Sequence, residues 1–120
     1  MTKEKQRIVI AEFCGWREAF PRHTDLGKER GGILLPYKWE QIGTGARGME
    51  PPNYPEDLNA MNEAECHLKV GQVELFVEEL MGLVPKSEYV PRDRLFWFCH
   101  ATASQRAEAF IKTLGLWEQD

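Results

Sequence analysis

The apolar positions of two segments repeat with the period of an α-helix. In 72–81 they fall at i, i+3, i+4 and i+7, with glutamates on the opposite side. In 103–114 they form a continuous stripe, which follows the Thr102-x-x-Gln105 pattern of a capping box and ends before Gly115. The sequence therefore predicts two amphipathic helices in these segments.

Two further helices are predicted from weaker patterns. The segment 2–14 starts at Thr2, a residue suited to capping a helix, and ends before Gly15, which is suited to stopping one. After Asn53 the sequence has an Asn-x-x-Glu pattern similar to a capping box, and apolar residues follow at helical spacing. These patterns predict helices over 2–14 and 54–69.

The other regular segments are short and predict a small sheet. The segment 95–99, Leu-Phe-Trp-Phe-Cys, is apolar at every position, which indicates a strand covered by helices on both faces. Two shorter strands are predicted at 16–20 and 33–35, and the glycines and prolines of 42–53 predict an exposed, irregular loop. The expected fold is α/β (α+β), with a small sheet between helical layers in an α/β/α sandwich, and residues 1–120 form one domain.

Composition and charge narrow the class of protein. Hydrophobic residues make up 42% of the chain and charged residues 28%, as in a soluble globular protein. The net charge of −4 disfavours nucleic acid as a partner, because binding the phosphate backbone requires a concentrated basic surface. Arg92, Arg94 and Arg106 are the candidates for a local basic patch, and solvated surface arginines are the simpler interpretation. The longest apolar run, 95–99, is too short to span a membrane.

The cysteines and histidines give no clear metal or catalytic set. The three cysteines are odd in number and have no repeated spacing, which indicates reduced, mostly buried thiols in a cytoplasmic protein. Two pairs, Cys66-His67 and Cys99-His100, raise the possibility of a zinc site with Cys14 and His23 as further ligands, and Cys99 raises that of a nucleophile. Adjacent residues point about 100° apart on a helix and to opposite faces on a strand, so neither pair is expected to bind one metal. No metal, cofactor or catalytic residue is predicted.

The segment Gly43-Thr-Gly-Ala-Arg-Gly48 matches the G-x-G-x-x-G spacing of dinucleotide sites. Such a site requires a strand before the glycines and a helix directly after them, because the helix N-terminus holds the pyrophosphate. Pro51 and Pro52 prevent an immediate helix here. A flexible loop is the better interpretation.

The polar residues of the predicted helix 54–69 are the best candidates for binding. Asn59, Asn62 and Glu63 share one face at i, i+3 and i+4, although Asn is a poor helix former in interior positions. A polar network with a neighbouring segment or a solvated face is the first explanation, a binding face is the second, and catalytic carboxylates are a third. Trp39 is a candidate exposed contact residue, because Trp is enriched in binding hot spots, and a core or loop-anchoring role is the simpler interpretation.

Three blocks of the chain resemble the phage "ABA sandwich" domain family, which consists of small phage and prophage proteins. The blocks are Ala11-Glu-Phe-Cys-Gly-Trp16, Tyr54 through Glu65, and Ala101 through Trp117. The core Asp-Leu-Asn-Ala-Met and the terminal Leu-Gly-Leu-Trp carry most of the resemblance. The family name implies an α/β/α sandwich, in agreement with the pattern above. It implies no activity, so no functional residue is carried over.

The expected function is therefore non-enzymatic. We expect a cytoplasmic phage or prophage accessory protein that binds another protein or associates with itself as a homo-oligomer. The alternative is a small enzyme or a metal- or ligand-binding protein that uses the Asn59, Asn62 and Glu63 face or Cys99. Modulation of nucleic acid is the least supported function.

Overall fold

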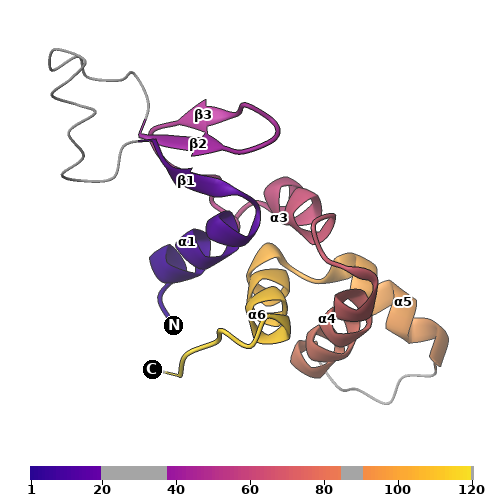
Figure 1. Ribbon diagram of the computed structural model, residues 1–120. Helices are drawn as coiled ribbons and strands as arrows, with labels where there is room; N and C mark the ends of the chain where they lie inside the picture. The colour runs from indigo at the N-terminus through magenta and orange to yellow at the C-terminus, as the bar shows by residue number, and fades with distance from the viewer. Residues whose placement is uncertain (20–37, 85–90, 120) are drawn as a thin grey trace, which may run out of the picture.

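The computed structural model describes residues 1–19, 38–84 and 91–119, with the backbone alone described for 91–94 (Figure 1). Five helices and three short strands follow one another in this part of the chain: α1 (Lys3–Phe13), β1 (Trp16–Glu18), β2 (Trp39–Gln41), β3 (Arg47–Gly48), α3 (Leu58–Glu65), α4 (Val70–Leu83), α5 (Pro91–His100) and α6 (Ala103–Thr113). The α+β class is confirmed.

The helices α1 and α6 begin where the sequence predicts. The Thr2 side chain accepts a hydrogen bond from the backbone N–H of Lys5 at the start of α1. At α6 the Thr102 hydroxyl accepts from the N–H of Gln105, and the Gln105 side chain accepts from the N–H of Thr102, which completes the capping box. Gly15 follows α1 with a φ of +90°, a left-handed conformation that favours glycine.

The second predicted helix starts later than expected. Asn53 does not cap it; its side-chain amide donates to Glu56 within a turn that precedes the helix. The cap is Asp57, whose carboxylate accepts from the N–H of Ala60, and α3 covers only Leu58–Glu65. The prediction of a helix over 54–69 was therefore too long at both ends.

The sheet is antiparallel, in the order β1-β2-β3, and lies at one end of the helical part (Figure 1). Trp16 of β1 pairs with Gln41 of β2, and Trp39 of β2 pairs with Gly48 of β3. The prediction of an irregular loop over 42–53 missed β3: the glycine-rich segment is the turn of a hairpin. The strand predicted at 33–35 lies outside the described residues.

The predicted central strand at 95–99 is wrong, because this segment forms the last half of helix α5. Five consecutive apolar residues fit a strand and a helix equally well, and Pro91 is favourable in the first turn of a helix. The sandwich arrangement depended on this strand. In the described residues the sheet is built instead by β1, β2 and β3.

The hydrophobic core is centred on α6, which packs against α1, α3 and α4 (Figure 1). Phe110 of α6 is fully buried, and its ring meets Phe13 of α1 at 5.4 Å and Phe76 of α4 at 6.4 Å between centroids. Both contacts are edge-to-face, the geometry that aromatic pairs prefer. Helix α5 packs against α4 and places its other side toward solvent.

Candidate functional site

A pocket of about 390 Å³ lies where α3, α4, α5 and α6 approach one another. Its apolar wall consists of Leu68, Val73, Phe76 and Phe98. The rings of Phe76 and Phe98 meet edge-to-face with centroids 6.5 Å apart. This volume and this lining are typical of sites that bind small molecules or single side chains.

The polar side of this pocket contains an ion pair that is largely removed from solvent. Nη1 of Arg106 on α6 lies 2.7 Å from Oε1 of Glu65 on α3, and their side chains are 6% and 15% exposed. The second terminal nitrogen of Arg106 donates to the backbone carbonyl of Phe98, and the guanidinium lies 4.9 Å from the centre of the Phe98 ring. Arg106 therefore connects α3, α5 and α6 through one side chain.

Burial changes the proton affinity of Glu65. The loss of solvent raises the pKa of the Glu65 carboxyl, and the charge and hydrogen bond of Arg106 lower it, with burial the larger effect. The Nε of Arg106 is buried and has no hydrogen-bond partner in the described residues. The stability of the Arg106–Glu65 ion pair therefore depends on whether water or another group contacts it in the pocket.

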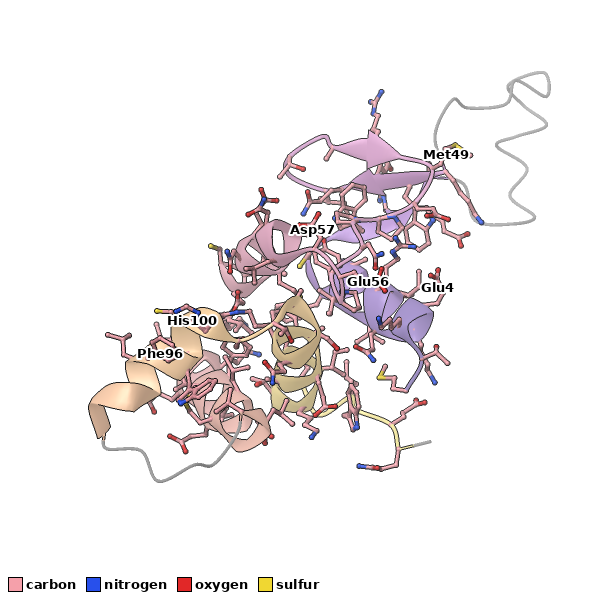
Figure 2. All side chains as sticks on the ribbon, turned by 180° about the vertical axis from the view of Figure 1, so that it is seen from behind. Glu4, Met49, Glu56, Asp57, Phe96 and His100 are labelled. Atoms are coloured by element: carbon pink, nitrogen blue, oxygen red, sulfur yellow. The ribbon has the colours of Figure 1, made fainter. Side chains whose placement is uncertain are left out.

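The outer side of α5 is apolar and continues from the pocket. Leu95 is 69% exposed and Phe96 is 54% exposed, and Cys99 is exposed while it also lines the pocket. The Phe96 ring stacks on His100 at 4.2 Å, and Figure 2 shows both side chains on the outer surface of α5. We call Leu95, Phe96 and Cys99 the α5 face.

The structure separates the residues that the sequence proposed for binding. Asn59, Asn62 and Glu63 are all exposed, and none of their side chains forms a hydrogen bond in the described residues, so they make no polar network there. Asn62 lines the Arg106 pocket, whereas Glu63 lines a different cavity. Asn62 and Cys99, proposed for different reasons, lie on the same pocket.

Trp39 is not an exposed contact residue. It is 8% exposed on β2 and belongs to the hydrophobic core cluster that also contains Trp16. The alternative role in the core is the one that the structure confirms. Of the other tryptophans, Trp97 and Trp117 are partly buried against the core.

The cavity lined by Glu63 has a volume of about 450 Å³ and lies between the β2–β3 hairpin and α3. Burial raises the pKa of the Cys14 thiol to about 11, and a hydrogen bond with Tyr54 opposes this shift. The pKa of Tyr54 is also raised, chiefly by burial. Cys14 is therefore a protonated, weakly nucleophilic thiol near neutral pH.

The exposure of Cys66 and Cys99 differs from the prediction that the thiols are mostly buried. All three cysteines are free, but only Cys14 is buried; Cys66 and Cys99 are exposed. In the described residues no three His, Cys, Asp or Glu side chains are grouped so that they could hold a metal ion. Gly43 and Gly45 have φ values of +95° and +72° in the hairpin turn between β2 and β3, so no helix follows them to hold a phosphate.

The sequence interpretation missed Arg106 and Glu65 as a site, although a signal was present. The simpler interpretation of Arg106 from the sequence, a solvated surface arginine, is wrong, because Arg106 is 5% exposed. It lies at i+3 from Ala103 on the apolar stripe of α6, and Glu65 lies at i+4 from Met61 on the stripe of α3. Opposite charges at core-facing positions of two helices predict a buried ion pair.

Comparisons with known proteins add no functional assignment: no family model, no curated protein and no solved structure matches the chain. Across residues 1–19, 38–84 and 91–119, none of the helices combines the length and the apolar character that a membrane span requires.

Proposed function

We propose that this protein is a non-enzymatic protein-binding module, and that the α5 face and the Arg106 pocket form its docking surface. One observation carries the proposal: Leu95 and Phe96, two large apolar side chains, are more than half exposed on a helix that also walls a pocket. Residues 95–99 of α5 are apolar at every position, and a helical segment of this kind is normally buried on all sides. A contiguous exposed apolar surface of this kind is typical of an interaction site.

The charge around the surface favours a particular partner. Helix α4, which packs beside α5, carries three glutamates and no lysine or arginine, whereas α5 carries Arg92, Asp93 and Arg94, so the two helices together have a net charge of −2. Each chain has a net charge of −4, so two copies repel one another. We therefore expect a segment of another protein with apolar anchors and basic residues, rather than a second copy of this chain.

The biological setting of the proposal comes from the sequence. The resemblance to small phage and prophage proteins suggests an accessory protein that acts in the bacterial host cell. Three free cysteines are consistent with the reducing cytoplasm.

The proposal is tested by selecting random peptides on the full chain and comparing their binding to a variant with Leu95→Lys and Phe96→Lys. Both side chains are exposed, so the variant is expected to remain folded, which circular dichroism checks. The matched control is Leu75→Lys, an exposed leucine on α4 that does not line the pocket. The selected peptides should carry apolar and basic residues, bind the control like the wild type, and lose most of their affinity for the α5 variant.

Two results would contradict the proposal. Peptides that bind the α5 variant as tightly as the wild type would place the binding surface elsewhere. A concentration-dependent dimer of the isolated protein in sedimentation experiments, abolished by the α5 substitutions, would identify the occupant of this face as a second copy.

A further inference from the structure

The polar side of the Arg106 pocket has one hydrogen-bond acceptor that is only partly used, the Glu65 carboxylate. The two terminal nitrogens of Arg106 already donate to Glu65 and to the Phe98 carbonyl, and its Nε is buried. The Glu65 carboxylate has room for several donors, but Arg106 is its only hydrogen-bond partner in the described residues. An occupant that donates one hydrogen bond therefore matches the polar side of the pocket.

The remaining walls of the pocket match an aromatic body. Phe76 and Phe98 supply ring edges and faces, and Leu68 and Val73 complete an apolar surface. Aromatic rings in such surroundings gain from edge-to-face and offset contacts in addition to the burial of apolar area. Cys99 lines the pocket and also belongs to the exposed α5 face, so a segment lying on that face is placed to insert one side chain.

We infer that the Arg106 pocket binds the indole ring of a tryptophan from the partner segment, with the indole N–H donating to the Glu65 carboxylate. Indole combines a flat apolar body with a single hydrogen-bond donor and has no acceptor. This inference rests on the proposed function, because it names the anchor residue of the same partner.

Charged occupants fit less well. A carboxylate would be repelled by the Glu65 charge, which already pairs with Arg106. An ammonium group would lose its hydration in a mainly apolar pocket and would lie near the Arg106 charge. A neutral N–H donor avoids both costs.

The test uses two isomers as probes: 3-methylindole, which is the tryptophan side chain, and 1-methylindole, which has the same size and no N–H. Each is titrated into the full chain and followed by NMR on the backbone amides and on the methyl groups of leucine and valine. We expect 3-methylindole to shift signals of residues that line the pocket, such as Leu68 and Val73. 1-Methylindole should bind about tenfold more weakly, because a hydrogen bond to a charged acceptor is lost.

A matched pair of variants locates the binding. Val73→Phe places a larger ring at the pocket and should abolish the shifts, whereas Leu75→Phe, on the same helix and away from the pocket, should leave them unchanged. Equal affinity of the two isomers, tighter binding of 2-phenylethylammonium, or binding that survives Val73→Phe would each overturn the inference. The absence of saturable shifts with 3-methylindole would do the same.

The failure of this inference is distinguishable from the failure of the proposed function. If the binding of the selected peptides depends on Leu95 and Phe96 but the peptides contain no tryptophan, the docking surface is supported and the indole anchor is contradicted. If 3-methylindole binds in the pocket but the Leu95 and Phe96 substitutions do not change peptide binding, the indole site is supported and the α5 face is not the docking surface.

Discussion

Arg106 and Glu65 form an ion pair of 2.7 Å between α6 and α3, with the charged ends of both side chains largely removed from solvent. Removing two charges from water costs several kcal/mol, which their attraction offsets only when the geometry is good. Removing one partner leaves the other charge buried and without compensation. The free energy of unfolding should therefore be sensitive to the substitution of either partner alone.

We therefore expect Glu65→Ala to lower the free energy of unfolding by about 3 kcal/mol, measured by urea denaturation. Glu108→Ala is the control, because Glu108 forms the i,i+4 pair with Lys112 at the surface of α6, a kind of pair worth about 0.5 kcal/mol. Equal effects of the two substitutions would show that the Arg106–Glu65 pair has no special importance.

The pKa of Glu65 provides a second prediction. Because its folded-state pKa is raised above the ordinary 4.5, the folded protein binds this proton more tightly than the unfolded chain does. The contribution of Glu65 to stability therefore increases as the pH falls from above the raised pKa to below 4.5. In Arg106→Met the attraction of the guanidinium is absent, so the Glu65 pKa should rise further, as followed by NMR of the carboxyl carbon. A lower Glu65 pKa in this variant than in the wild type would contradict the assignment of Arg106 as the group that lowers it.

Phe110 should be among the most sensitive positions of the core. Phe110→Ala removes its ring contacts with Phe13 and Phe76 and leaves a cavity, at a cost of about 3–5 kcal/mol. Phe96→Ala, on the exposed side of α5, should change the stability by about 1 kcal/mol or less. Thermal unfolding of the two variants measures the difference, and a larger effect of Phe96→Ala would show that the α5 face is part of the core.

The three cysteines should react with iodoacetamide at very different rates. Cys66 and Cys99 are exposed and should be alkylated in the native protein at pH 7.5. Cys14 is buried with a pKa of about 11, so it should react only after unfolding in urea. Mass spectrometry of peptides from native and denatured samples gives the order of reaction. Early modification of Cys14 would contradict its placement in the core.

Part of the fold could be predicted because it depends on local chemistry. Thr2 and the Thr102–Gln105 capping box mark the starts of α1 and α6 through hydrogen bonds within one turn. Gly115 has a φ of +73° just after α6, in agreement with its prediction as the stop. Such signals need no information about the rest of the chain.

The remaining parts depend on tertiary contacts. The apolar run 95–99 forms a helix because its flanking residues and its packing on α4 decide between two conformations that its sequence allows equally. The choice of Asp57 rather than Asn53 as the cap of α3 is similar, since both residues are good caps. The two interpretations of Trp39 stayed open because the sequence does not show which side of β2 faces the hydrophobic core.

The candidate site was predicted only in fragments. Asn62 and Cys99 were singled out for separate reasons, and only the fold brings them to one pocket. Arg106 and Glu65 occupy core-facing positions that helical periodicity reveals, but their pairing across 41 residues of sequence requires the packing of α3 on α6.

The most direct test of the docking surface is the affinity of one selected peptide, measured by fluorescence anisotropy. The peptide is titrated with three proteins: the wild type, the variant with Leu95→Lys and Phe96→Lys, and the Leu75→Lys control. Two buried apolar anchors are each worth about 1.5–3 kcal/mol, so the α5 variant should bind at least about a hundredfold more weakly. The control should bind like the wild type. Equal affinity for all three proteins would show that α5 is not the binding surface.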